Sequence, residues 1–143
     1  MADAGPLHLV VLDGDYCVYR LDPSAAVPSP PAGAGLFSVT RTSEELSVVA
    51  PAGSEPEGTE AEGPFAAMRV AGELPFTLTG ILAGLCGAIA GAGVPVFAIS
   101  TFDTDYLLVP RHGLEAAAGA IETAGHRVEV QAPAGGAPGG RRE

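Results

Sequence analysis

A stretch without any charged side chain runs from Leu74 to Phe102 and constrains the fold of this 143-residue chain more than any other feature. The stretch is long enough to span a bilayer as a helix. However, it contains Pro75, Pro95 and five glycines, and the Gly-Ala-Gly sequence at 91–93 before Pro95 is a helix stop signal. The pattern therefore favours a buried helix followed by a buried strand, and it argues against a membrane span.

The charged residues are few and mostly acidic. Seven basic residues, all arginine, stand against seventeen acidic ones, for a formal net charge of −10. Nucleic acids and anionic membrane surfaces both require a basic face, so this balance argues against either partner. The first residues lack the basic and apolar regions of an export signal. We therefore expect a cytoplasmic protein whose two cysteines, Cys17 and Cys86, are reduced thiols.

The second half of the chain carries alternating strand and helix signals. A threonine, Thr77 or Thr79, is suited to cap the first of two helices, and Gly125 is suited to end the second. The expected order is strand 65–71, helix to about residue 92, strands 94–101 and 106–109 as a hairpin, helix 113–124 and strand 126–130. This order predicts an α+β domain of the ferredoxin-like βαββαβ type, an antiparallel sheet with both helices on one face.

The first half reads as strands and loops. Asp13-Gly14 is a tight-turn sequence, which predicts a hairpin of residues 7–12 and 16–21. A second strand pair is expected at 36–41 and 45–50. Four glutamates are expected to keep a flexible loop at 51–64 solvated: Glu55, Glu57, Glu60 and Glu62. The expected organisation is a strand-rich half at 7–64, a βαββαβ half at 65–131 and a disordered tail at 132–143.

The first helix has glycine on one side and bulky side chains on the other. At about 100° per residue, Gly80, Gly84, Gly87 and Gly91 share one narrow stripe, while the bulky apolar residues lie opposite and should face the sheet. Such a stripe permits close approach of another backbone, which suggests a domain or subunit interface. The abundance of Gly and Ala throughout the chain offers the alternative that the stripe arises by chance.

Sequence signatures of catalysis are absent. The three histidines are scattered without metal-ligand spacing, and no phosphate-binding glycine loop or nucleophile elbow occurs. Cys86 lies in the uncharged helix and Cys17 between two tyrosines, positions typical of structural cysteines. We therefore expect no enzyme activity, no metal and no cofactor.

Two neighbouring features are suited to a small ligand. The helix entrance, from Pro75 to Ile81, offers free backbone N–H groups and threonine hydroxyls to a carboxylate. The hairpin tip carries Asp103 and Asp105, which are suited to an ammonium or guanidinium group. Ordinary helix capping and turn formation are the alternative explanations. Together, the two features match a zwitterion.

Three segments show a family resemblance: Phe76–Leu82, Ala92–Tyr106 and Phe37–Val49. They resemble ACT domains of the CASTOR-like arginine sensors and their small bacterial relatives, and the Ile-Ser-Thr-x-Asp-Thr-Asp-Tyr segment is the specific part. The resemblance, which covers most of residues 7 to 130, implies a non-catalytic tandem ACT protein that forms homodimers and binds an amino acid at a domain interface. It implies these ligand-binding residues: Phe76, Thr77, Thr79, Gly80, Ile81, Ser100, Thr101, Asp103 and Asp105.

The leading hypothesis is therefore a cytoplasmic amino-acid sensor, in which ligand binding stabilises one arrangement of domains or subunits. The second hypothesis is a protein-interaction module without a small ligand, with the glycine stripe and acidic loop as partner surfaces. The third is an enzyme of unrecognised type that uses Asp103 and Asp105 as acid and base.

Overall fold

The computed structural model describes residues 5–72 and 80–132, and within them the chain forms two compact units. One unit, named the αβ unit here, comprises the described parts of Met1–Leu12 and Ala66–Gln131. The other, named the β unit, is formed by Asp13–Phe65. Strand β5 (Glu60–Val70) belongs to both, because the division falls after Phe65.

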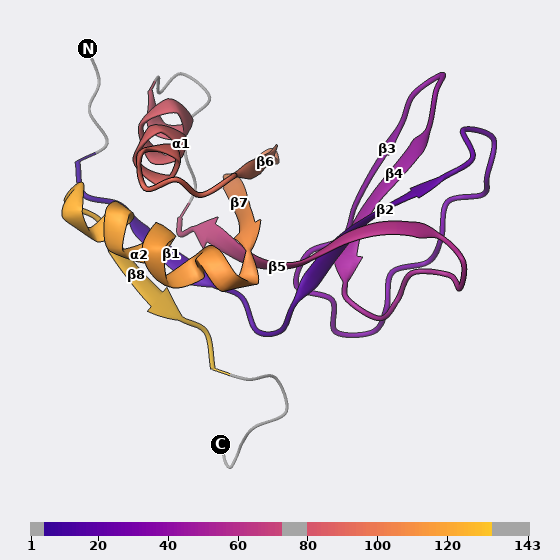
Figure 1. Ribbon diagram of the computed structural model, residues 1–143, viewed down its shortest axis with the longest axis horizontal. Helices are drawn as coiled ribbons and strands as arrows, with labels where there is room; N and C mark the ends of the chain where they lie inside the picture. The colour runs from indigo at the N-terminus through magenta and orange to yellow at the C-terminus, as the bar shows by residue number, and fades with distance from the viewer. Residues whose placement is uncertain (1–4, 73–79, 133–143) are drawn as a thin grey trace. The chain divides into compact units, whose positions relative to one another are not determined.

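The αβ unit contains the strand and helix order that the sequence predicts. After β5 come α1 (Ile81–Gly91), β6 (Phe97–Ser100), β7 (Asp105–Pro110), the short 3-10 turn η1 (Arg111–Gly113), α2 (Leu114–Thr123) and β8 (Arg127–Val130) (Figure 1). The first strand of the chain, β1 (His8–Val11), joins this unit. The sheet order is β8-β1-β5-β7-β6. Neither α1 nor α2 is long and apolar enough to cross a bilayer.

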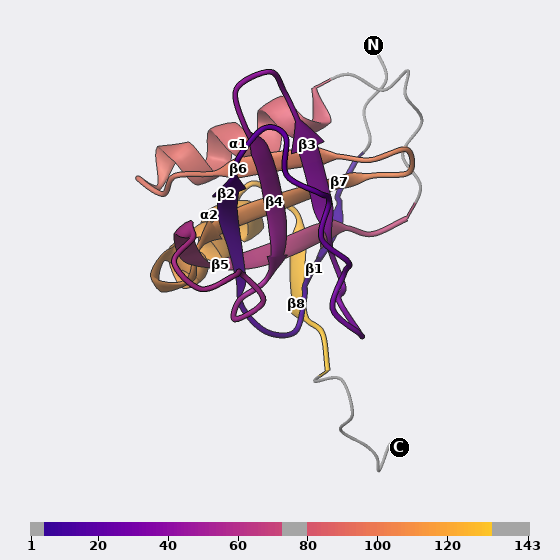
Figure 2. The same cartoon turned by 90° about the vertical axis from the view of Figure 1, so that its right-hand side faces the viewer.

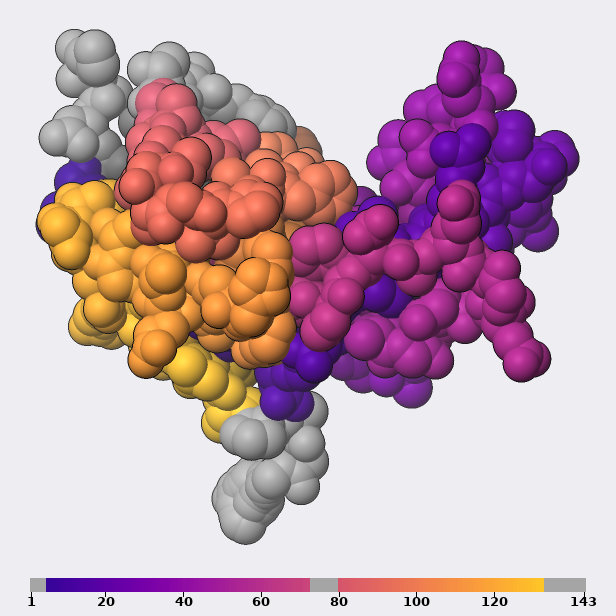
Figure 3. Space-filling model, viewed as in Figure 1, coloured from indigo at the N-terminus to yellow at the C-terminus, as the bar shows by residue number. Residues whose placement is uncertain are grey.

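The core of the αβ unit lies between the sheet and one layer of two helices. Alternate residues of the strands, such as Leu9 in β1 and Met68 in β5, are fully buried against Leu85 of α1 and Ile121 of α2. Both helices therefore cover the same face of the sheet, as the ferredoxin-like pattern predicts. Figure 3 shows the surfaces of α1 and α2 adjoining each other. The prediction that the bulky side of α1 faces the sheet is confirmed.

The partners of β1 differ from the prediction. The expected hairpin of residues 7–12 with 16–21 is wrong, because β1 pairs antiparallel with β5 and parallel with β8. Leu9 is opposite Val70 on one side and Val128 on the other. In a plain βαββαβ sheet, the strands corresponding to β5 and β8 would be neighbours, and here β1 lies between them. Residues 7–12, expected in the first half, thus belong to the αβ unit.

The β unit is a sheet in the order β3-β4-β2-β5. Its strands β2 (Tyr16–Leu21), β3 (Ser38–Arg41) and β4 (Leu46–Pro51) run side by side in Figure 2. The predicted pairing of β3 with β4 is confirmed. The turn between them is closed by the backbone N–H of Thr42, which donates to the carbonyl of Glu45 at 2.9 Å. One face of the sheet buries an apolar cluster of Cys17, Tyr19, Leu46, Val48 and Ala50.

Two further sequence predictions need correction. The expected acidic loop at 51–64 is shorter, because β5 begins at Glu60 and pairs with β2 over Glu60 and Glu62. The helix N-cap is also different: α1 begins after Gly80, whose positive φ of 83° is easily adopted without a side chain, and among the described residues no side chain caps the helix. The predicted capping threonines and residues 133–143 of the predicted tail lie outside the described residues.

Candidate functional site

The tip of the β6–β7 hairpin brings a serine and an aspartate together. Ser100 ends β6 and Asp105 begins β7, and the two residues are directly opposite each other in the antiparallel register. Opposite residues place their side chains on the same face of the sheet. The Ser100 hydroxyl donates a hydrogen bond of 2.6 Å to Oδ1 of Asp105. One oxygen of this half-buried carboxylate is therefore held in place by its own hairpin.

The turn between the two strands is closed by a pair of threonines. The backbone N–H of Thr101 donates to the carbonyl of Thr104 at 2.8 Å, and the N–H of Thr104 donates to Oγ1 of Thr101 at 3.2 Å. Between them, Phe102 is 81% exposed and Asp103 is also exposed. The turn thus presents an aromatic ring and a carboxylate to solvent, whereas Asp105 lies at the sheet.

Thr104 also fixes the hairpin to the sheet. Its side chain is buried, and its hydroxyl donates a 2.6 Å hydrogen bond to the backbone carbonyl of Val70. Val70 is the last residue of β5, from which the chain continues toward α1. Buried hydroxyls require such a partner because desolvation without one is costly. The hairpin tip is therefore attached at the end of β5 that leads to the helix entrance.

Helix α1 also lies close to the hairpin carboxylate. Burial raises the pKa of the Cys86 thiol in α1, and the negative charge of Asp105 raises it further. Cys86 packs at the edge of the core and is half-buried. Asp105 is two residues from Leu107 on β7, and Leu107 is buried in the core that α1 covers. Both side chains therefore lie on the sheet face that packs against α1.

The structure brings some of the predicted ligand residues together and leaves others apart. Ser100, Thr101 and Asp105 lie at one hairpin tip, whereas the Asp103 side chain extends to solvent without a described contact. At the helix, Gly80 is exposed and the side chain of Ile81 packs at the core. Phe76, Thr77 and Thr79 lie outside the described residues.

Sequence reasoning missed Thr104 because threonine and aspartate are both ordinary turn residues. The available signal is the strand period after the turn. Side chains alternate along a strand, so Thr104 and Tyr106 lie on the same face as the buried Leu108, and Asp105 lies on the opposite face. This alternation predicts that Thr104, which bonds to Val70, and Asp105 lie on different faces of the sheet.

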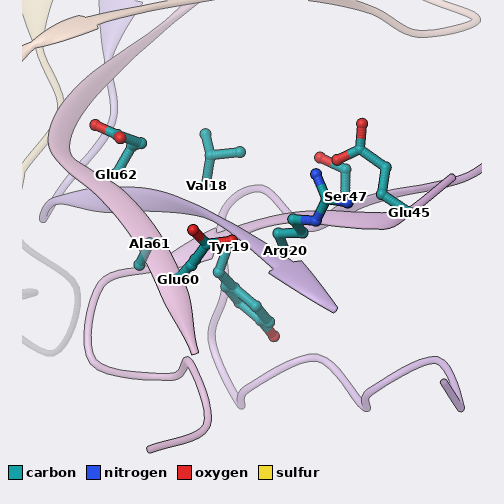
Figure 4. A pocket seen from close by; sticks show the side chains of 8 residues that line it. All are labelled: Val18, Tyr19, Arg20, Glu45, Ser47, Glu60, Ala61 and Glu62. Carbon is teal, nitrogen blue, oxygen red and sulfur yellow. The ribbon is translucent and has the colours of Figure 1, made fainter. Parts of the chain in front are cut away.

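A second concave region lies on the β unit and was also missed. This hollow, named the β-unit groove, has a volume of about 350 Å³ and is lined by Val18, Tyr19, Arg20, Glu45, Ser47, Glu60, Ala61 and Glu62 (Figure 4). Figure 4 shows the side chains of Val18, Arg20 and Glu62 on one side of the strands, while the Tyr19 ring extends from the other. The side chains of Val18, Arg20 and Glu62 therefore lie on the sheet face opposite the apolar cluster that includes Cys17 and Tyr19.

A buried thiol in the β unit is bonded to a loop carboxylate. The Sγ atom of Cys17 donates to Oε1 of Glu55 at 3.2 Å, and the same oxygen accepts the Gly53 N–H at 2.9 Å. Burial, reinforced by the hydrogen bond and the charge of Glu55, raises the pKa of Cys17 to about 12. A thiol with this pKa is protonated at neutral pH and is a poor nucleophile. The arrangement therefore holds the loop and is unsuited to thiol chemistry.

Among the described residues, no group of three His, Cys, Asp or Glu side chains is arranged to hold a metal ion. Both cysteines are free thiols. Two features of the described residues are candidate sites: the hairpin tip, with its oriented carboxylate, and the mixed-charge β-unit groove.

Comparison with protein families gives two matches along the chain. A family model described as an ACT domain matches residues 60–123. A second model, which describes the N-terminal domain of a protein family, matches residues 14–57. No curated protein matches the sequence.

Several solved structures are similar to this one. A crystal structure of a protein from Agrobacterium tumefaciens is 33% identical in sequence, covers 90% of this chain and 96% of its own, and has a TM-score of 0.81. A Vibrio cholerae protein of unknown function, described as a possible transport protein, is 19% identical, with 82% and 88% coverage and a TM-score of 0.67. The ligand-free regulatory subunit of aspartate kinase from Thermus thermophilus is 15% identical, with 81% and 96% coverage and a TM-score of 0.57. The latter two similarities show a shared fold.

Proposed function

Since this chain belongs to the ACT domain family, we propose that it is a non-catalytic regulatory protein that binds an amino acid at the hairpin tip of its αβ unit. The observation that carries the proposal is the Ser100–Asp105 hydrogen bond of 2.6 Å. It orients a half-buried carboxylate at the sheet end where the chain leaves β5 toward α1. An oriented carboxylate is suited to the ammonium group of an amino acid.

The remaining predicted residues have complementary roles in this proposal. The backbone at Gly80 and Ile81 begins α1, and a helix start favours a carboxylate through its free N–H groups and dipole. Phe76, Thr77 and Thr79, outside the described residues, are proposed to complete that end of the site. In this proposal Asp105 binds the ammonium group of the ligand, and Asp103 either binds a cationic side chain of the ligand or remains in solvent.

The proposed response is regulatory. Binding that is tighter in one arrangement of the two units, or of two subunits, shifts the population toward that arrangement. A homodimer in the cytoplasm is the proposed setting. No catalytic step is needed, because the ligand acts through its differential affinity for the two arrangements.

Thermal unfolding of the full chain in the presence of each common amino acid tests this function. A ligand at about 100 times its dissociation constant stabilises the native state by about 2.7 kcal/mol. We expect a raised melting temperature with one or a few amino acids. The shift should be lost in Asp105→Asn and kept in Glu122→Gln, which removes an exposed carboxylate of α2. An Asp105→Asn protein that keeps the full shift would contradict the proposed site.

A protein-interaction module is the second candidate. It is favoured by the aromatic ring of Phe102, which is 81% exposed at the hairpin turn beside the exposed Asp103. Exposed aromatic side chains are common anchors of protein interfaces. A flat response to every amino acid, together with partner capture that depends on Phe102, would favour this second function.

A further inference from the structure

The connection between β2 and β3 shows a burial pattern that repeats every three residues. It contains no helix or strand. Ala25, Pro28 and Pro31 are half-buried, and the two residues between each pair are exposed. An α-helix repeats about every 3.6 residues and a strand every two, whereas a polyproline II helix has three residues per turn. Residues 25–31, named the proline segment here, therefore have the periodicity of a polyproline II helix that packs along one edge.

The composition of the proline segment explains this conformation. Pro28, Pro30 and Pro31 fix φ at about −65°, close to the polyproline II value of about −75°. A residue before proline is sterically confined to the extended and polyproline II regions, which applies to Val27 and Ser29. Polyproline II has no internal hydrogen bonds, and within the described residues the interior of the segment makes none. Its interior carbonyl groups are therefore available as acceptors.

Hydrogen bonds hold the proline segment near both ends. The guanidinium of Arg41 in β3 donates from Nη1 to the carbonyl of Pro23 and from Nη2 to that of Ala25 at 2.8 Å. Ala25 also packs against the apolar cluster of the β unit. At the other end, the Ala34 N–H donates to the Pro31 carbonyl at 3.2 Å. The segment is therefore held in place before any partner binds, which reduces the conformational entropy lost on binding.

The outer edge of the proline segment is apolar and uncharged. Val27 and Pro30 are three residues apart and so share this edge, and Val27 is 55% exposed. No charged residue occurs from position 23 to 37. In sequence, the charge before this stretch is the exposed Asp22, and the charge after it is Arg41, which is engaged with the two carbonyls. The edge thus combines apolar side chains with backbone acceptors.

We propose that the proline segment is a docking ligand for a partner protein with an aromatic-lined groove. Pro28 and Pro31 have the Pro-x-x-Pro spacing that such grooves bind in the polyproline II conformation. Aromatic rings of the partner pack on the exposed edge of Val27 and Pro30. Indole N–H or tyrosine O–H groups of the same rings donate to the interior carbonyls of the segment.

The charge of the chain restricts the kind of groove. An acidic groove would need a cation beside the prolines, and residues 23–37 carry none. Asp22 and the net charge of −10 repel such a groove instead. A groove with an uncharged or basic rim is therefore the fitting partner. Only residues of the β unit are involved, so this surface is independent of the function proposed for the hairpin tip.

An isolated WW domain, which reads proline-rich segments with an aromatic groove, is the probe for this surface. It is added to the isotope-labelled full chain. Binding is followed by the backbone amide NMR signals of Ala26, Val27 and Ser29, since proline has no N–H. We expect these signals to shift at up to millimolar probe concentration, without shifts in the αβ unit. An SH3 domain with an acidic groove should bind at least about five-fold more weakly, because Asp22 and the acidic chain repel it.

Matched variants then separate specific docking from general stickiness. Pro30→Ala removes ring methylene groups from the exposed edge and should weaken WW-domain binding roughly five-fold or more. Val27→Ser should act in the same direction. Pro56→Ala removes an exposed proline from another loop of the same unit and should leave binding unchanged. Unshifted NMR signals of β2, β3 and β4 will show that each variant is folded.

Probe-induced shifts that are confined to the proline segment and lost in Pro30→Ala would support the docking surface. The absence of any shift at millimolar concentration would overturn it, as would equal losses of binding in Pro30→Ala and Pro56→Ala. Equally tight binding of the acidic SH3 domain would contradict the restriction on the groove. Signals of the segment that shift with protein concentration alone would identify a second copy as the occupant and would overturn the proposed partner.

Discussion

The hydroxyl of Thr104 donates a 2.6 Å hydrogen bond to the backbone carbonyl of Val70, thirty-four positions earlier in the chain. It joins the residue before β7 to the last residue of β5, at the sheet end that bears the hairpin carboxylate. Because Thr104 is 7% exposed, water cannot readily replace this bond.

Replacing Thr104 with valine should therefore destabilise the protein. The variant keeps the shape of the side chain but leaves the Val70 carbonyl without its buried partner, at a cost of about 1–3 kcal/mol. Urea unfolding of the full chain measures the difference. Thr104→Ser retains the hydroxyl and should recover most of the loss. If the valine and serine variants unfold at the same midpoint, the hydrogen bond does not contribute to stability.

The contact between Cys17 and Glu55 should make stability depend on acid pH. Hydrogen bonds from its own backbone N–H and from Cys17 hold the pKa of Glu55 below its ordinary value of 4.5. A lowered folded-state pKa stabilises the native state above the unfolded value, and this contribution disappears as the pH falls through the folded value.

Urea midpoints measured from pH 6 downward test this dependence. The parent protein should lose stability below about pH 4.5 more steeply than Glu55→Gln, which cannot ionise. Cys17→Ser keeps a donor for the carboxylate and should retain the steep dependence, whereas Cys17→Ala should flatten it in part. Parallel curves for the parent and Glu55→Gln would show that this carboxylate does not contribute.

The proximity of Asp105 to Cys86 should appear in thiol reactivity. The charge of Asp105 is the second cause, after burial, of the raised pKa of Cys86. Asp105→Asn should lower that pKa and increase the thiolate fraction, so that alkylation by iodoacetamide at pH 8 becomes faster. Asp103→Asn is the matched control, because its exposed side chain has no described contact with the helix.

Mass spectrometry of the alkylated protein gives the rate for each cysteine separately. Cys17, with a pKa of about 12, should stay unmodified in the native protein on the timescale of the Cys86 reaction. Equal acceleration by Asp103→Asn and Asp105→Asn would argue against a specific influence of Asp105.

At the glycine stripe on α1 we expect a substitution that stabilises the protein. Gly84 is exposed, and a Cβ atom added there meets nothing within 4 Å. Alanine is a better helix former than glycine, so Gly84→Ala should stabilise a free α1 surface by about 0.5–1 kcal/mol. Thermal unfolding together with gel filtration measures both stability and oligomeric state. If Gly84→Ala instead weakens a dimer, the stripe is a subunit contact, as the helix wheel suggests.

Local patterns in the sequence were sufficient for much of the αβ unit. The apolar side of residues 81–91 and the stop signal at Gly93 predicted α1, and the apolar runs around Asp103 predicted the β6–β7 hairpin. Helices and hairpins are formed by residues close in sequence, so their signals are local. For the same reason, the sequence alone places both candidate carboxylates, Asp103 and Asp105, at the hairpin turn.

The partners of isolated strands were decided only in the tertiary structure. An apolar run such as Leu9–Val11 is compatible with any strand that offers free backbone groups, and Asp13-Gly14 suggested the nearest one, β2. In its observed position between β5 and β8, Leu9 is buried under both helices. This burial of apolar surface is favourable, but it depends on residues far away in the sequence, so no local pattern predicts it.

The β-unit groove depends on tertiary structure in the same way. The segment that contains Glu60 and Glu62 has a composition typical of a solvated loop. Its strand conformation follows from pairing with β2, some forty residues earlier in the chain. The sequence by itself determined which segments are helices, hairpins and apolar faces, because those depend on neighbours along the chain. The tertiary structure decided that Arg20 lies opposite Glu60 in the strand register and that the Thr104 hydroxyl bonds to the Val70 carbonyl, because strand register is set by packing across the whole sheet.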